Sequence, residues 1–344
     1  MDTSLKYRER FLRNQLTFRK KFKDVFDKVA SDFASLSSDP NIKFSKSFKF
    51  PEQIDRKMTA ITTQLHQDLL VLTETEIESS WMMSNAKNDD IINDYLKTTS
   101  TIKLAQKAGY YLPNIPALKA FLSRKSDTGT LSDAVWKIAR QARAEMEIHL
   151  GIGIMNGDSA QVISRRIRQY LNNPDALFRR VRDKKGKLVP SKAMKLNAPG
   201  TGVYNSAYKN AMRVTRTETN MAYLLADHLR WEKLDMVLGF EVVISEQHQI
   251  TDICDDLQGR YPSYFVFTGW HPQCLCHATP ILTPEQDFAA YLRGEKSLKG
   301  KKIDKLPENF VSYTQENFEK YSAYKNTPYW MADNAEVIQE EVLK

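Results

Sequence analysis

Soft metal ligands gather in one short stretch of this chain. Its only cysteines are Cys254, Cys274 and Cys276, and they fall within a window of 23 residues that also contains His271. Thiolate sulfur and imidazole nitrogen suit Zn²⁺, which usually takes four such ligands in a tetrahedron. An odd number of cysteines, two of them in a C-x-C pair, argues against a disulfide framework. The spacing therefore predicts a structural zinc site formed by Cys254, His271, Cys274 and Cys276.

Other side chains near this cluster leave its composition and its role open. His248 and His277 are alternative ligands, and Asp252 is a weaker one. Metal-free buried thiols beside a hydrogen-bonded histidine are a further interpretation, because one C-x-C pair is less diagnostic than two C-x-x-C knuckles. A catalytic zinc would need an open position and a general base, for which Asp252, Asp255 and Asp256 are available. The chain lacks H-E-x-x-H and the paired motifs of a zinc deaminase, so we expect no enzymatic activity.

Positive charge concentrates between Arg165 and Arg216. This segment has fourteen Lys or Arg residues and two acidic residues, whereas the formal charge of the whole chain is +8. Clustered cations attract phosphates through counterion release, so we expect contact with nucleic acid or an acidic partner. A solvated basic surface is the alternative. The candidate contact residues are Arg165, Arg166, Arg168, Arg179, Arg180, Arg182, Lys184 and Lys185.

A second polar motif, RVTRTETNMAY, spans residues 213–223. On a helix, Arg213 and Arg216 lie on one side, whereas Glu218 points elsewhere. We interpret Arg213, Arg216 and Glu218 as a structural polar network that ties this helix to the strand and the metal loops, with contact to a partner as the alternative. Trp270 and Tyr264, beside the cysteines, either stack on bases or form a small aromatic core.

Most of the elements that position these residues are predicted to be helices. Apolar spacing predicts a mainly helical stretch over residues 5–125 and further helices over 131–150, 160–171 and 204–234. Thr130 or Ser132 and then Ser159 supply helix caps. Residues 179–202 suggest an exposed loop or arm, and β-branched residues predict strands at 238–245 and 279–282. A short helix at 284–293 precedes a Lys-rich loop and a Tyr/Asn-rich tail.

These elements predict an α+β fold that is predominantly helical, with a long N-terminal helical region followed by a small β-containing Cys/His module stapled by metal. We divide the chain into an N-terminal helical region (1–127), a helical lead-in with a basic arm (128–203), a core with the Cys/His module (204–282), and a peripheral helix and tail (283–344). No apolar run approaches the roughly 18 residues of a membrane span, and no secretory signal is evident, so we expect a soluble cytosolic protein without a membrane partner.

Several motifs follow one another as they do in the phage Mu F-like minor head proteins, the phage head-morphogenesis family. The chain resembles that family from about residue 130 to residue 285. The matching residues are RTE at 216–218 with Ala222 and Tyr223, then Asp252, Cys254 and Gly259, and finally His271, Pro272, Cys274, Cys276 and Pro280. Leu275 is a departure, because members commonly carry Arg between the two cysteines.

The resemblance implies a structural and assembly function in the head of a tailed phage or prophage. Such proteins occur in few copies per virion and associate with the portal protein or the major capsid protein, with packaged DNA as a further candidate partner. The implied location is the virion head, and the host cytoplasm during assembly. The alternatives are a sequence-independent nucleic-acid-binding protein of a mobile element and, as a weaker fit, a zinc-dependent hydrolase or nuclease.

Overall fold

The structure is a computed structural model that describes residues 3–42, 50–97, 109–126, 129–173, 180–190, 204, 206–245, 248 and 251–344. Long helices dominate it, and a small antiparallel sheet lies in the C-terminal part, which confirms the predicted α+β class. The chain forms two compact units, each assembled from separated segments. The first comprises Met1–Gln15, Thr75–Asp127 and Arg216–Lys344, and the second comprises Leu16–Glu74 and Thr128–Thr215.

Within the described ranges, six helices of nine residues or more precede the sheet. They are α1 (Thr3–Ser35), α2 (Glu52–Leu96), α4 (Ile115–Ser123), α5 (Leu131–Met155), α6 (Ala160–Asn172) and α8 (Ala207–Trp231), with a 3₁₀ turn, η1 (Leu36–Ser38), after α1. The predicted caps are confirmed: Thr130 and Asp133 form a capping box at α5, and the Ser159 hydroxyl accepts from the backbone of α6. None of the described helices is long and apolar enough to cross a membrane.

The core of the second unit is built from apolar stripes on several helices. On α1, Phe18, Phe22 and Phe26 recur every four residues and are buried, as expected for one face of a helix. The ring of Phe26 packs edge-on against Tyr208 of α8, with ring centroids 5.6 Å apart. The other helices contribute Leu65, Leu69, Val135, Ile138, Met146, Ile163, Ile167 and Ala211 to the buried set.

A buried carboxylate lies within this second unit. Glu145 of α5 is 1% exposed, and its Oε1 accepts a hydrogen bond of 2.9 Å from the backbone N–H of Ala207, at the start of α8. The Gln141 amide donates to the same oxygen. Burial disfavours the charged carboxylate and raises the pKa of Glu145 from 4.5 to about 8.

The raised pKa of Glu145 predicts a pH-dependent stability. Between pH 4.5 and about 8 the folded chain holds a proton on Glu145 that the unfolded chain has released. The free energy of unfolding should therefore fall as pH rises through this window, by an amount on the order of a few kcal/mol. Urea denaturation at intervals across the window should show this fall in the wild type and a flatter profile for Glu145→Gln.

His149 also makes the stability depend on pH, so the contribution of Glu145 must be measured as a difference between two proteins that both contain His149. Burial lowers the pKa of His149 to about 4, so this group destabilises the fold as pH falls below its ordinary value of 6.5. Because both proteins contain His149, the difference between wild type and Glu145→Gln isolates Glu145. Glu147→Gln, a less buried change on the same helix, should leave the profile as in the wild type. Identical profiles for wild type and Glu145→Gln would contradict the prediction.

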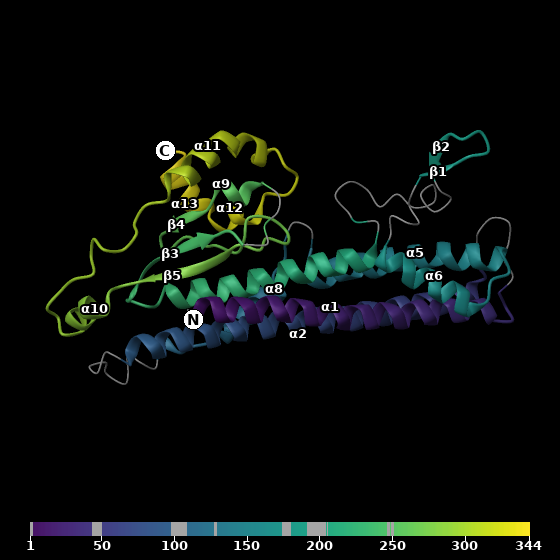
Figure 1. The fold of residues 1–344 in the computed structure, drawn as a ribbon, viewed down its shortest axis with the longest axis horizontal. Coiled ribbons are helices and arrows are strands. Elements are labelled where there is room, and N and C mark those ends of the chain that lie inside the picture. The colour runs from purple at the N-terminus through teal and green to yellow at the C-terminus, as the bar shows by residue number, and fades with distance from the viewer. Residues whose placement is uncertain are drawn as a thin grey trace. The chain divides into compact units, whose positions relative to one another are not determined.

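The first unit contains a three-stranded antiparallel sheet of order β4-β3-β5. Its strands are β3 (Val237–Val243), β4 (Gly259–Tyr261) and β5 (His277–Leu282). β3 pairs with both neighbours, so that Phe240 lies opposite Tyr261 on one side and Pro280 on the other. Figure 1 shows β3 between the other two strands, beside the C-terminal end of α8. Strands are confirmed near both predicted positions, whereas β4 was not predicted.

The helix predicted after β5 is confirmed as α10 (Glu285–Leu292), and residues 293–307 form the predicted loop. The tail that follows forms α11 (Glu308–Ser322), α12 (Tyr329–Asp333), α13 (Ala335–Val337) and a π-helical turn, η3 (Ile338–Val342). Phe310 of α11 and Trp330 of α12 are fully buried, and their ring centroids lie 6.2 and 5.9 Å from the ring of Trp270. The helices of the tail were not predicted, because these apolar residues are sparse in sequence and meet only through tertiary packing.

A buried charge pair joins α2 to α8 within the first unit. The Lys87 ammonium contacts the Asp227 carboxylate, and both side chains are at most 2% exposed. Ser84 and Asn88 donate further hydrogen bonds of 2.6 and 2.7 Å to Asp227. The ammonium also lies 4.9 Å from the centroid of the Tyr223 ring. Polar and aromatic groups of the protein therefore take the place of water around both side chains.

Candidate metal centre

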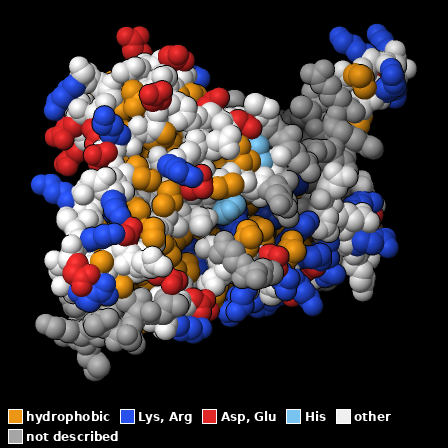
Figure 2. Space-filling model, turned by 60° about the vertical axis from the view of Figure 1, so that its left-hand side comes forward, with side chains coloured by type: hydrophobic (Ala, Val, Ile, Leu, Met, Phe, Trp, Pro, Cys, Tyr) orange, Lys and Arg blue, Asp and Glu red, His pale blue; other side chains and the backbone are white. Residues whose placement is uncertain are grey.

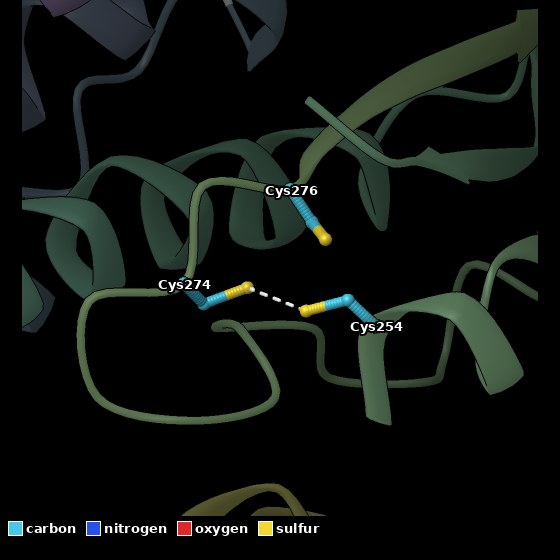
Figure 3. A group of neighbouring side chains, drawn as sticks. All are labelled: Cys254, Cys274 and Cys276. Carbon is cyan, nitrogen blue, oxygen red and sulfur yellow. Dashed lines mark hydrogen bonds between the residues drawn. The ribbon is translucent and has the colours of Figure 1, made fainter. Parts of the chain in front are cut away.

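Three buried sulfur atoms converge in the first unit. Cys254 comes from the short helix α9 (Ile253–Asp256), Cys274 from the loop before β5, and Cys276 from the residue directly before that strand. Each residue is at most 2% exposed, and the three Sγ atoms all lie within 4.8 Å of one another. Figure 3 shows the Cys254 and Cys274 sulfurs pointing toward each other and the Cys276 sulfur turned toward the same space. These three residues could hold a metal ion.

The spacing of two of these sulfurs fits tetrahedral coordination. The Sγ atoms of Cys254 and Cys274 are 3.7 Å apart. Sulfur ligands about 2.3 Å from a tetrahedral Zn²⁺ are separated by about 3.8 Å, which is the edge of that tetrahedron. The distance is much longer than a disulfide bond of about 2.05 Å. All three cysteines are free thiols. The cluster is therefore arranged as a ligand set rather than as a disulfide.

His271, the fourth predicted ligand, lies at the edge of the sulfur cluster. Its Nε2 atom is 3.1 Å from the Cys254 Sγ, and its Nδ1 atom is 2.9 Å from the carbonyl oxygen of Pro272. A carbonyl only accepts, so Nδ1 can donate to it, whereas Nε2 faces both the Cys254 Sγ and, at 3.3 Å, the Oδ2 atom of Asp252. Among the described residues, however, the set of ligand atoms within 4.8 Å of one another contains the three sulfurs without His271. His271 thus contacts one sulfur directly and would need a small movement to share an ion with all three.

The alternative ligand His248 belongs to a neighbouring group. Its Nε2 atom lies 3.0 Å from an Asp255 oxygen and 3.6 Å from Asp252 Oδ1. With Asp252 and Cys254 it forms a second set of mutually close ligand atoms. The hydrogen bond to Asp255 raises the pKa of His248. His277, the other alternative, follows Cys276 in β5 and is in neither set of the described residues.

The acidic residues around Cys254 shape its turn. Asp252 Oδ1 accepts from the Cys254 N–H at 2.8 Å, and Asp255 Oδ2 accepts from the Asp252 N–H at 2.8 Å. This reciprocal pair is a capping box at the start of α9. Both carboxylates therefore have a structural task that fixes the backbone carrying Cys254. Their candidate role as a general base stays a prediction.

A constrained loop delivers the other two cysteines. Gly269 has φ +108°, and a Cβ added there would lie 3.3 Å from the Cys274 Cβ. Gln273 has φ +64°, and its N–H donates to the Thr217 hydroxyl of α8 at 3.0 Å. The Cys274 N–H closes the turn on the His271 carbonyl at 3.0 Å. The backbone between Gly269 and Cys274 is thus held both locally and by α8.

An arginine from the N-terminal helix reaches the C-x-C turn. Arg8 of α1 is 7% exposed, and its Nη2 donates to the carbonyl oxygen of Leu275, between Cys274 and Cys276. Sequence analysis did not identify Arg8. Its position on the helix could have indicated its burial. The buried residues on this face of α1 recur at helical spacing and are Ser4, Tyr7, Arg8, Phe11 and Gln15. A charged residue on a buried helix face indicates a specific buried partner.

When no ion is bound, hydrogen bonds between the thiols shift their pKa values in opposite directions. The pKa of Cys274 lies well below its ordinary value because the Cys254 and Cys276 thiols donate to its thiolate. The pKa of Cys254 is raised, chiefly by its hydrogen bond to Cys274. The pKa of Cys276 is raised as well, so without an ion the cluster favours a single thiolate, on Cys274.

Aromatic residues enclose the cluster. Trp270, 2% exposed, packs against Phe267 with ring centroids 4.9 Å apart, which supports the core interpretation of this residue. Tyr264 is 38% exposed, and its hydroxyl donates to Glu341 at 2.7 Å.

The side chains of the polar motif on α8 have several different neighbours. Glu218 forms an ion pair with Arg124, at 2.5 Å. The guanidinium of Arg213 lies 5.9 Å from the centroid of the Tyr204 ring. Arg216 is half-buried. One contact between α8 and the loop before β5 is made by Thr217, which sequence analysis did not single out.

The predicted basic contact residues occupy two elements of the second unit. Arg165, Arg166 and Arg168 are exposed on α6, where Arg166 pairs with Asp158 and Arg168 donates to Ser31. A hairpin of β1 (Arg180–Arg182) and β2 (Leu188–Pro190) follows.

The turn of this hairpin is strongly cationic. Arg182, Lys184, Lys185 and Lys187 are exposed there, and Figure 2 shows the blue side chains on the hairpin at the upper right. The Asp183 carboxylate accepts from two backbone N–H groups and orders the turn. Arg179 lies outside the described residues, as does the side chain of Arg180.

Comparisons with known proteins give no assignment: no family model, no curated protein and no solved structure matches this chain.

Proposed function

We propose that Cys254, Cys274 and Cys276 bind one Zn²⁺, with His271 as the fourth ligand. The observation that carries this proposal is the convergence of three buried sulfurs, with one pair at 3.7 Å. The orientation of the His271 imidazole supports its role, since Nδ1 faces the Pro272 carbonyl and Nε2 faces Cys254. A backbone acceptor on the distal nitrogen is the usual arrangement for a metal-binding histidine.

Such a site is structural rather than catalytic. Three thiolates and one imidazole complete a tetrahedron and leave no position for water or substrate. The neighbouring carboxylates of Asp252 and Asp255 accept from backbone N–H groups of the α9 turn. The ion would join α9, the loop before β5 and the start of β5, so its binding energy would stabilise this part of the fold. We therefore infer that the chain is not an enzyme.

At the level of the whole chain we propose a structural and assembly protein of a tailed phage or prophage head. The support is the order of the motifs around Arg216, Cys254, His271 and Cys276, which resembles the Mu F-like minor head proteins, together with the closed geometry inferred for the metal site. The proposed partners are the portal protein or the major capsid protein, at few copies per virion. The location would be the virion head, after assembly in the host cytoplasm.

Sequence-independent binding to nucleic acid is a second candidate function. The cationic hairpin turn favours it, because Arg182, Lys184 and Lys185 are all exposed at one end of a short hairpin. Exposed cations close together bind phosphates without reading the base sequence. In the phage context the nucleic acid would be packaged DNA. In the alternative, the chain would be a DNA-binding protein of a mobile element.

Neutralising the hairpin separates these two functions. The triple change Arg182→Gln, Lys184→Gln and Lys185→Gln should leave co-purification with a co-expressed portal protein from the same genome intact. If the hairpin binds DNA, the change should also reduce the slope of log K against log salt by about one for each phosphate that the protein no longer neutralises. Both readouts use the full chain, in pull-down and in fluorescence anisotropy with duplex DNA.

A matched control makes the same charge change elsewhere. Lys299, Lys302 and Lys305 are exposed outside the basic segment, so their replacement by Gln should alter neither readout. Failure of the wild-type chain to bind the portal protein, combined with steeply salt-dependent DNA binding that the hairpin change abolishes, would contradict the assembly function and favour the alternative.

A further inference from the structure

Arg8 is a buried cation without a carboxylate partner in the described part of the chain. Its Nη2 donates to the Leu275 carbonyl, whereas its buried Nη1 has no hydrogen-bond partner there. Its other close neighbour is the ring of Phe11, whose centroid lies 5.6 Å from the guanidinium carbon. Burial of an uncompensated guanidinium is strongly unfavourable, so a charge of opposite sign must lie close by.

Other buried cations of the first unit have carboxylate partners. Lys87 pairs with Asp227, and Arg230 lies 2.9 Å from Asp89. Arg8 instead donates to the carbonyl oxygen of Leu275, the residue between the candidate ligands Cys274 and Cys276. The anionic group that this position offers Arg8 is the metal–thiolate cluster.

The charge of the sulfur cluster matches that of one arginine. A divalent ion bound by three thiolates and one neutral imidazole carries a net charge of −1. One guanidinium neutralises this charge and stabilises the thiolates on which the ion depends.

We propose that Arg8 is a positioning residue of the metal centre, which holds the Cys274–Cys276 turn through the Leu275 carbonyl and balances the negative charge of the metal–thiolate group. The proposal rests on the metal site proposed above. It also links two distant parts of the chain, since Leu275 follows Arg8 by 267 residues. Metal binding and docking of residues 3–15 of α1 should therefore strengthen each other, because such coupling is reciprocal.

Zinc affinity of the full-length chain tests the proposal. Competition with a colorimetric zinc chelator should show that Arg8→Met lowers the affinity by about 10–100-fold, the usual effect of removing a group that supports metal ligands. Arg8→Lys keeps the charge without the planar fork, so its loss should be smaller. Arg13→Met, on the same helix with a side chain 78% exposed, should bind zinc as the wild type does.

A second measurement does not depend on the folding of a variant. Hydrogen exchange of the wild-type chain should show that zinc removal lowers the protection of residues 3–15, with residues 16–35 of the same helix as the internal reference. Wild-type zinc affinity in a folded Arg8→Met chain, or unchanged protection of residues 3–15 after zinc removal, would overturn the role of Arg8 and leave the metal site standing. A wild-type chain that binds no zinc would overturn both proposals.

Discussion

Replacement of Cys276 by serine should release the metal and destabilise the first unit. Wild-type protein should contain about one zinc ion per chain by elemental analysis, and Cys276→Ser should contain much less. A hydroxyl is a poor zinc ligand, so the remaining donors would leave the tetrahedron incomplete. Structural zinc contributes about 10–16 kcal/mol of binding energy in small zinc-finger peptides. Here, where an aromatic core also holds the module, we expect a loss of about 3 kcal/mol or more.

Calorimetry of the full chain should register this loss as a lower melting temperature, by about 6–12 °C for a unit of this size. Ala278→Ser is the matched control. It places the same hydroxyl two residues further along, within β5, at a position only 6% exposed, without removing a sulfur. The control should keep its zinc and show a smaller shift. If Cys276→Ser retains wild-type zinc content and melting temperature, Cys276 is not a ligand.

The second large effect concerns the buried pair of Lys87 and Asp227. Lys87→Met should lower the free energy of unfolding by about 3–5 kcal/mol, because it leaves a carboxylate buried without its counter-charge. Ser84 and Asn88 would still donate to Asp227. Burial already raises the pKa of Asp227, so the variant should take up a proton there on folding. Urea denaturation followed by the fluorescence of the tryptophans would measure the loss.

An exposed pair near the end of the same helix is the control. Lys97 and Asp94 are 2.8 Å apart, but their side chains are 73% and 56% exposed. Lys97→Met should change the stability by at most about 1 kcal/mol, as is typical of surface ion pairs. The double change Lys87→Met with Asp227→Leu removes both buried charges and should recover part of the loss. A cost for Lys87→Met no greater than that for Lys97→Met would show that the buried pair contributes little.

Local features of the sequence were sufficient to predict much of the fold. The periodicity of apolar residues predicted the long helices, and the capping roles of Thr130 and Ser159 followed from residue type and position. Cys254, Cys274 and Cys276 were recognisable as a group because they lie close together in the chain, and the structure brings their sulfurs within 4.8 Å of one another. Such predictions succeed because the interacting residues are neighbours in sequence.

The partners that complete the site were decided by tertiary structure alone. Arg8 and Thr217 lie on helices far from the cysteines in sequence, and each contacts one backbone group of the loop between Gly269 and Cys276. Phe310 and Trp330 lie in a tail for which no helix was predicted, and they pack against Trp270 because the chain folds back on itself. Helical periodicity indicates which face of a helix is buried, but the partner of that face depends on how the chain folds back on itself. The sequence alone therefore determined the candidate ligands, and the tertiary structure determined the charge and packing around them.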